Sequence, residues 1–222
     1  MESLKIVYID NHLIAAVKPA GVPSQEDETG DVCIGDMVKA FIKEKFNKPG
    51  DVYLGVLHRL DRPVGGIMLF ARTSKCAARL SEQFQNQKVH KTYVALLTGI
   101  PVQSERKLEH FLYKPGSTNK VKASPVPFPG AKKAILEYKV LKTGNQASLV
   151  EVTPLTGRQH QIRVQMASIK CPIKGDIKYG SHVPNPDKSI CLFAHKIRFQ
   201  HPISQKEMEL VATLPIEDWW KL

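Results

Sequence analysis

The chain has 222 residues, 42% of them hydrophobic, which is enough to bury one sizeable core and to form a single domain over residues 1–222. Its 32 basic residues outnumber its 21 acidic ones and give a net charge of +11, which favours a polyanionic partner, nucleic acid before membrane. No stretch reaches the roughly 18 apolar residues of a membrane span. The chain opens without a secretory signal, and its four cysteines lie far apart, so we expect a cytoplasmic protein with no metal site and no membrane attachment.

The hydrophobic patterns predict short strands alternating with a few helices. In chain order they predict strands at residues 5–10 and 13–18, a helix at 31–46, a buried strand at 67–70, a helix at 74–87 capped by Thr73 or Ser74, strands at 90–98, 134–141 and 148–153, a helix at 158–168, and strands at 192–202 and 208–213. Residues 114–133 are expected to be irregular, because prolines at that density resist regular structure. The lysines of this stretch favour contact with a phosphate backbone, and a solvated loop is an equal alternative.

A carboxylate in a turn is the strongest candidate for chemistry. Asp61 stands between Arg59 and Arg62, and a proline, two glycines and an apolar run follow it. Nearby positive charge favours the ionised form of a carboxylate, which suits a nucleophile or a base. The plainer alternative is an Asp that caps the turn and pairs with one of the two arginines on the surface.

Four segments, in this order, carry a family signature. They are His58-Arg59-Leu60-Asp61, Lys91-Thr92-Tyr93-Val94-Ala95-Leu96, Thr156-Gly157-Arg158-Gln159-His160-Gln161-Ile162-Arg163-Val164, and Pro172-Ile173 with Gly175-Asp176-Ile177-Lys178-Tyr179-Gly180. Together they resemble the large-subunit (RluA-type) family of RNA pseudouridine synthases over nearly the whole chain. Two departures stand out: Val64-Gly65-Gly66 replaces the usual Thr-Ser-Gly, and Gln159 replaces the usual Thr.

The resemblance implies a fold, a reaction and a partner. The fold is α+β, a mixed and largely antiparallel β-sheet with flanking helices, without the separate N-terminal RNA-binding domain that many relatives carry. The reaction converts uridine in ribosomal or transfer RNA to pseudouridine and needs no cofactor and no metal. Because recognition is left to the catalytic domain, we expect an RNA stem-loop as the target and a monomer as the active form.

The resemblance also assigns roles to residues. Asp61 is expected to attack C1′ or C6, or to remove a ribose proton, and these alternatives stay open. Tyr93 is expected to stack on or orient the uracil, and Arg163, at the border of an apolar helix face, to hold Asp61 through its guanidinium. Arg59 is expected to fill the gap left by a flipped base or to grip a phosphate. The remaining candidates for substrate binding are Arg62, His160, Gln161 and Ile162, although His160 and Gln161 have the plainer alternative of supporting the fold.

Two rival functions are set against the synthase. The first is a non-catalytic RNA-binding protein that retains the synthase fold, which Val64 and Gly65 make conceivable. The second is a hydrolase that uses Asp61 and water to release free uracil. That enzyme would need a second, acidic carboxyl group, and no other motif offers one.

Overall fold

The computed structural model describes residues 4–116 and 118–222, and these fall into two compact units. Of these described residues, 4–90 and 194–213 form the first unit, and 91–116, 118–193 and 214–222 form the second. The expected single domain over residues 1–222 stays a prediction.

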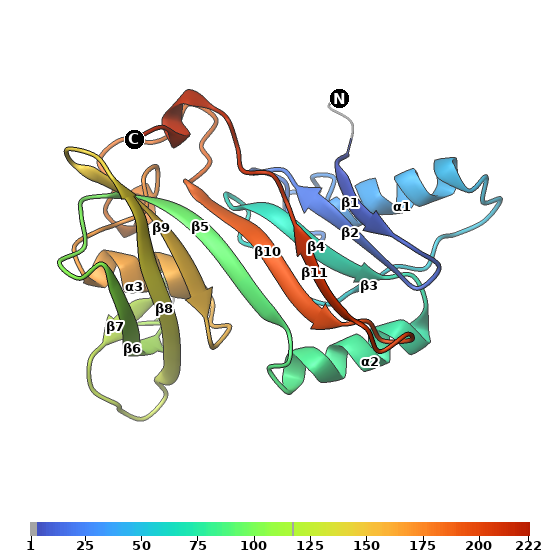
Figure 1. The fold of residues 1–222 in the computed structure, drawn as a ribbon, viewed down its shortest axis with the longest axis horizontal. Helices are drawn as coiled ribbons and strands as arrows, with labels where there is room; N and C mark the ends of the chain where they lie inside the picture. The colour runs from blue at the N-terminus through green and yellow to red at the C-terminus, as the bar shows by residue number, and fades with distance from the viewer. Residues whose placement is uncertain (1–3, 117) are drawn as a thin grey trace. The chain divides into compact units, whose positions relative to one another are not determined.

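A buried antiparallel sheet forms the centre of the first unit (Figure 1). Its elements are β1 (Ile6–Ile9), β2 (Leu13–Lys18), α1 (Ile34–Lys45), β3 (Gly55–Val56), β4 (Gly65–Ala71), α2 (Ser74–Gln85), β10 (Leu192–Gln200, whose first two residues precede the unit) and β11 (Glu207–Val211). The strand order is β1-β2-β4-β10, with β11 on β10 and β3 on β4. Every residue of β4 is buried, so this strand is the core of the unit.

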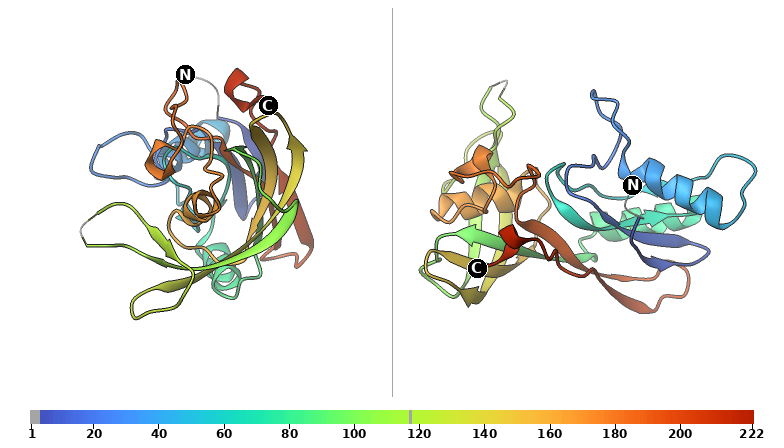
Figure 2. Two further views of the ribbon diagram at one scale, coloured as in Figure 1. Left: turned by 90° about the vertical axis from the view of Figure 1, so that its left-hand side faces the viewer. Right: turned by 90° about the horizontal axis from the view of Figure 1, so that it is seen from above.

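Two helices, α1 and α2, belong to this unit (Figure 2). Each begins next to a side chain that accepts a hydrogen bond from a backbone N–H group. The hydroxyl of Thr73 accepts a hydrogen bond of 3.2 Å from the Cys76 N–H, as expected for an N-cap at the start of α2. At the start of α1 the Asp36 carboxylate accepts a hydrogen bond of 3.3 Å from the backbone N–H of Cys33. The expected helix at 31–46 therefore begins later than predicted, at Ile34.

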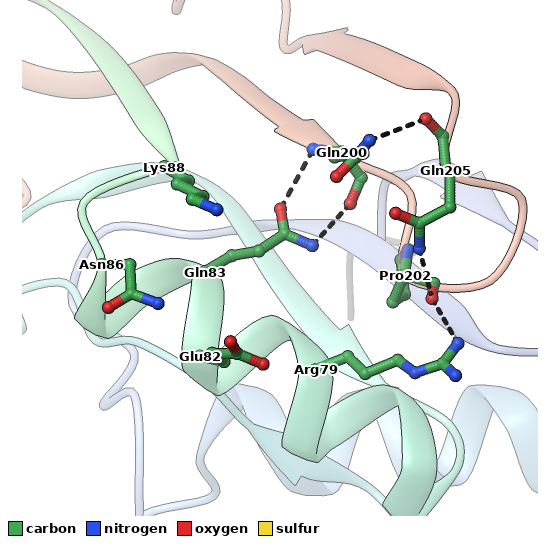
Figure 3. Close-up of a pocket in the computed structure, with 8 residues that line it drawn as sticks. All are labelled: Arg79, Glu82, Gln83, Asn86, Lys88, Gln200, Pro202 and Gln205. Atoms are coloured by element: carbon green, nitrogen blue, oxygen red, sulfur yellow. Dashed lines mark hydrogen bonds between the residues drawn. The ribbon is translucent and has the colours of Figure 1, made fainter.

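Polar side chains of α2 brace the turn between β10 and β11 (Figure 3). The amide of Gln83 donates to the carbonyl of Gln200 at 2.8 Å and accepts from its N–H at 3.1 Å, which satisfies both backbone groups. The Arg79 guanidinium donates to the carbonyl of Pro202 at 2.7 Å. These residues line a polar hollow of about 330 Å³, and their mutual bonds fix the helix against the turn.

The second unit is an antiparallel sheet with a single α-helix against it. Its elements are β5 (His90–Thr98), β6 (Glu105–Tyr113), β7 (Lys122–Ser124), β8 (Lys132–Thr143), β9 (Ala147–Pro154), α3 (Gln161–Ser168) and the 3-10 turns η1 (Ile177–Tyr179) and η2 (Asp218–Trp220). The strand order is β5-β9-β8-β6-β7. A small cluster of buried residues, among them Leu112, Val164 and Tyr179, joins α3 and η1 to the sheet.

A buried glutamine ties α3 to its sheet. Gln165 is fully buried, and its Nε2 donates to the carbonyls of Leu108 on β6 and Ala134 on β8, both at 3.3 Å. Because an unsatisfied buried N–H donor is costly, these bonds tie the helix to the sheet, although the Oε1 of Gln165 is buried without a hydrogen-bond partner.

Three expectations need correction. Residues 114–133 are not wholly irregular, because β7 and the start of β8 lie within them and β7 pairs along the edge of β6. The strand β6 was not predicted. The helix expected from Arg158 begins at Gln161, because His160 adopts a left-handed backbone, with φ of 53°, that cannot continue a helix.

The expected α+β class, a largely antiparallel sheet with flanking helices, is confirmed. All four cysteines carry buried, free thiols, as expected for reduced cysteines. Within residues 4–116 and 118–222, no helix is long and apolar enough to cross a membrane.

Candidate active site

The half of the predicted site in the first unit is the turn that leads into β4. Asp61 is half-buried, and its carbonyl accepts a hydrogen bond of 2.9 Å from the Val64 N–H, which closes the turn. The side chain of Val64 is buried at 2% exposure, so it anchors the turn in the apolar core. Asp61 therefore lies in the turn just before the buried strand β4, as the sequence predicts.

The glycine pair after Val64 has a steric cause. Gly66 has φ of 127°, and a Cβ there would lie 2.4 Å from the backbone nitrogen of Ala194 and 2.5 Å from its oxygen. No side chain fits such a gap, so close approach of two backbones demands glycine at this position.

The two residues that open the signature segment lie in different surroundings. His58 is built into the fold: its Nε2 accepts a hydrogen bond of 2.9 Å from the Leu69 N–H, and its ring stacks on Phe84 with centroids 5.1 Å apart. Arg59 is exposed. Its side chain is thus available to solvent partners, and its expected role toward a flipped base or a phosphate stays a prediction.

Arg62 is held by an acidic loop of the same unit. Its guanidinium pairs with Asp31 and lies 3.5 Å from the carboxylate of Asp27, and its Nη1 donates to the Thr29 hydroxyl at 3.3 Å. The hydroxyl of Thr29, and after it the positive charge of Arg62, hold the pKa of the Asp31 carboxyl below its usual value. The pKa of the Asp27 carboxyl is likewise lowered, first by the Thr29 hydroxyl, so both carboxylates are ionised at neutral pH and together carry one more charge than Arg62.

Sequence reasoning missed a buried lysine beside Asp61. Lys18 has no exposed surface, and its Nζ donates to the carbonyls of Pro19, Val22 and Arg62 at 3.0, 2.7 and 3.1 Å. Burial lowers its pKa to about 7, while the negative charge of Asp61 opposes that shift. The sequence did contain a signal for Lys18, because it ends an apolar strand. A lysine buried there needs hydrogen-bond acceptors, and the loop that starts at Pro19 can supply them.

The half of the predicted site in the second unit begins on β5. Tyr93 is 8% exposed and lies opposite Val152 in the antiparallel pair β5–β9. Its place on a paired strand fixes the position of its ring.

Gln161 and Ile162 open α3 from buried positions. The Gln161 amide accepts from the Thr156 hydroxyl at 2.8 Å and from the Arg158 N–H at 3.0 Å, and it donates to the carbonyl of Ile135 at 2.9 Å. These bonds shape the turn before the helix, in line with the structural alternative for Gln161.

His160 meets Tyr179 at the other side of this turn. The Nδ1 of His160 lies 2.7 Å from the Tyr179 hydroxyl, which also accepts a hydrogen bond of 3.0 Å from the N–H of Val121. The two rings cross edge to face, with centroids 5.6 Å apart. His160 thereby connects α3 to η1.

Arg163 reaches the interior, as its place at the border of the apolar face predicts. It is 5% exposed, and its Nε and Nη2 donate to the two oxygens of Asp176 at 2.7 and 2.9 Å. Its guanidinium also lies 5.0 Å from the centre of the Tyr179 ring. Such a two-point ion pair fixes the plane of the guanidinium. The expected contact of Arg163 with Asp61 stays a prediction.

Asp176 is the second residue that sequence reasoning missed as a site residue. It is 1% exposed and lies thirteen positions after Arg163. Its signal was the arginine itself, since a buried guanidinium requires a carboxylate partner. The preceding Gly175, with φ of 87°, has Asn185 at 2.7 Å from any Cβ, so it lets the chain turn in a crowded place.

The described residues contain no group of three His, Cys, Asp or Glu side chains placed to hold a metal ion.

Comparisons with known proteins agree on one class of enzyme. A family model described as RNA pseudouridylate synthase matches residues 12–168. A protein of Rickettsia conorii named ribosomal large subunit pseudouridine synthase C is 35% identical over 95% of this chain and 68% of its own length. A protein of Zymomonas mobilis named as an uncharacterized RNA pseudouridine synthase is 32% identical over 95% of this chain and 94% of its own length.

Solved structures show the same fold. The human RNA pseudouridylate synthase domain containing 4 superposes with a TM-score of 0.79 at 25% identity, over 97% of this chain and 90% of that one. The human RNA pseudouridylate synthase domain containing 1 also gives a TM-score of 0.79, at 23% identity over 99% and 87% of the two chains, and supports the fold alone.

Proposed function

This chain belongs to the RNA pseudouridylate synthase family and is an isomerase acting on uridine in RNA, and we propose that its substrate is the RNA of the large ribosomal subunit. The observation that carries the proposal is the identity of 35% with a synthase named for that subunit, over 95% of this chain. The net charge of +11 supports a large polyanion as the partner. We further propose that the enzyme acts as a monomer in the cytoplasm, on a stem-loop whose target uridine can leave its stack.

The reaction rearranges one nucleotide without changing its composition. The N1–C1′ bond breaks, the uracil turns while it is retained, and C5 bonds to C1′; the hydrogen on C5 leaves as a proton, and N1 takes up a proton. No electron acceptor and no donor group takes part, so side chains suffice for every step.

Asp61 is proposed to act at the sugar. Breaking the N1–C1′ bond builds positive charge at C1′, which a fixed carboxylate stabilises or traps covalently. Its place in a closed turn ahead of a buried strand supports the role, because the turn limits its motion. Attack at C1′, attack at C6 and removal of a ribose proton all start from the same ionised carboxylate.

Tyr93 and Arg163 complete the proposed catalytic set. Tyr93 is proposed to stack on the uracil and to assist loss of the C5 proton, and its buried place on β5 supports a fixed ring. Arg163 is proposed to hold Asp61 ionised with the part of its guanidinium that faces away from Asp176.

Substrate contacts are proposed for the residues around these three. Arg59 is exposed and suits either the gap left by the flipped base or a phosphate. His160, Gln161 and Ile162 are proposed to shape the wall near the uracil through the turn that they form. Arg62 stands apart from this set, because two carboxylates already hold its guanidinium.

The proposal is tested with unmodified large-subunit ribosomal RNA and bulk transfer RNA, each transcribed with tritium at C5 of uridine. We expect tritium release from the ribosomal RNA and a product nucleoside of unchanged mass. Release from transfer RNA alone would overturn the assignment of the substrate. An abasic site with free uracil would show a hydrolase instead.

A further inference from the structure

The peptide group before Asp61 is held by a single serine remote in sequence. Ser24 is 6% exposed, and its hydroxyl donates to the carbonyl of Leu60 at 2.7 Å and accepts from the N–H of Leu60 at 3.0 Å. Leu60 is itself buried, so water does not replace these bonds readily. One hydroxyl therefore satisfies both polar backbone atoms of the residue next to Asp61.

The residue after Asp61, Arg62, is held by the same stretch of chain. The carbonyl of Arg62 accepts hydrogen bonds from Lys18 at 3.1 Å and from the N–H of Gly21 at 2.8 Å. In return the Nε of Arg62 donates to the carbonyl of Gly21 at 3.0 Å. Gly21 has φ of 85°, a backbone conformation that glycine adopts without strain.

An acidic loop then closes on the tip of the Arg62 side chain. Asp31 pairs with Nη2, Asp27 lies 3.5 Å from Nη1, and the Thr29 hydroxyl bonds both carboxylates and accepts from the guanidinium. Carboxylates at this place are unusual in a chain of net charge +11 that binds a polyanion. A phosphate of the RNA that approached Arg62 would meet the negative charge of both carboxylates.

We propose that residues 18–31 form a positioning clamp for Asp61, in which Ser24 fixes the peptide before it, while Lys18, Gly21 and the acidic loop hold Arg62, the residue that follows it. The inference rests on the proposed role of Asp61 in the reaction. Arg62 is then a positioning residue, and it acts on the rate through Asp61. The sequence-based expectation for Arg62 was contact with the substrate. Loss of a substrate ligand weakens RNA binding, whereas loss of a positioning residue lowers the rate.

The discriminating experiment neutralises the two carboxylates of the acidic loop, Asp27 and Asp31. Single-turnover tritium release from large-subunit ribosomal RNA, with enzyme in excess, gives a maximal rate and a half-saturating enzyme concentration. Asp27→Asn combined with Asp31→Asn should lower the maximal rate roughly 10- to 100-fold, because small displacements of a reacting group have effects of that size. Both residues are exposed, so the variant is expected to fold.

A matched control lies on the same loop. Glu26→Gln combined with Glu28→Gln removes the same two negative charges from exposed positions of the loop. If charge alone mattered, both double variants would change RNA binding equally and neither would change the maximal rate. The clamp predicts the same small change in half-saturation for both, and the loss of rate only for the Asp27 and Asp31 variant.

Ser24 gives a second, independent arm. Ser24→Ala should lower the maximal rate about 10-fold with half-saturation unchanged. Ser148→Ala is its control, because Ser148 is likewise buried and its hydroxyl donates to the carbonyl of Gly99 at 2.8 Å, in the second unit. Both variants lose a buried hydrogen bond and some stability, but only the first should lose rate.

Three outcomes overturn the clamp. If the Asp27 and Asp31 variant has a maximal rate within twofold of the unaltered protein, the acidic loop does not position Asp61. Weaker RNA binding at full rate in Arg62→Ala makes Arg62 a substrate ligand. Absence of pseudouridine from the unaltered protein on every RNA offered refutes the proposed function, and the clamp with it.

Discussion

The buried amine of Lys18 makes the stability of this chain depend on pH above neutrality. Its pKa in the folded chain is about 7, against an ordinary value of 10.5, because burial disfavours the charged form. Between these two values the unfolded chain binds a proton that the folded chain has released, so the free energy of unfolding rises with pH. Below pH 7 both states are protonated and the contribution no longer changes.

The size of the effect follows from the same two values. The whole difference corresponds to roughly 5 kcal/mol, at about 1.4 kcal/mol for each pH unit well inside the window. Between pH 7 and pH 9, where the transition is only beginning, we expect about 2 kcal/mol. Lys18 has no exposed surface, so solvent screening does little to reduce this figure.

The assay compares the unaltered chain with Lys18→Met in urea, followed by circular dichroism from pH 6 to pH 9.5. Other titrating groups are common to both proteins, so the difference between their unfolding free energies isolates Lys18. That difference should move by about 2 kcal/mol in favour of the unaltered chain between pH 7 and pH 9. Lys39→Met, at an exposed position of α1, gives the background of removing a lysine. A difference that stays constant across this range would refute the reasoning.

The same measurement on Asp61→Asn tests the coupling between the two residues. The negative charge of Asp61 raises the pKa of Lys18, so its removal should move the onset of the rise to lower pH. An onset that does not move would show that the two charges do not interact.

Three further changes test single contacts. Gly66→Ala should prevent folding or lower the yield of soluble protein severely, because its Cβ would lie 2.4 Å from Ala194; a soluble variant of unchanged melting temperature would contradict the backbone geometry. Asp176→Asn should cost about 3–5 kcal/mol in urea unfolding, since it leaves the buried Arg163 without its carboxylate; a loss below about 1 kcal/mol would argue against a buried pair. Burial raises the pKa of Cys191 to about 11, so this thiol should resist iodoacetamide at pH 8 until urea unfolds the chain, as mass spectrometry can show.

Two strands could be predicted with their bounds because each is a short, mainly apolar run with few interruptions. Leu13–Lys18 and His90–Thr98 have the bounds that the sequence predicts. In Glu105–Tyr113 only Leu108 and Leu112 are buried, and the first half of the strand is mostly charged, so a period of two in hydrophobic residues is not visible. Lys122–Ser124 is only three residues long, and Ala123 is its one apolar side chain, so no hydrophobic pattern could indicate it.

The site residues also divide into those that local sequence patterns indicate and those that depend on contacts made in the fold. Asp61 and Tyr93 stand out from local patterns and from the family signature, whereas Asp176 and Lys18 depend on partners that folding brings to them. Helix α3 shows the limit most clearly, because Gln161, Arg163 and Gln165 are all buried polar residues. Each side chain donates a hydrogen bond to an acceptor outside the helix, and the spacing of apolar residues cannot reveal such a partner.

The central claim is that Asp61 carries out the isomerisation of uridine. Its most direct test is pseudouridine formation on large-subunit ribosomal RNA by the unaltered protein, by Asp61→Asn and Asp61→Ala, and by Asp51→Asn as a control at an exposed position of the same unit. We expect pseudouridine from the unaltered protein and from the control, and none from either Asp61 variant, although both still bind RNA. Pseudouridine formed at the unaltered rate by Asp61→Asn would contradict the account.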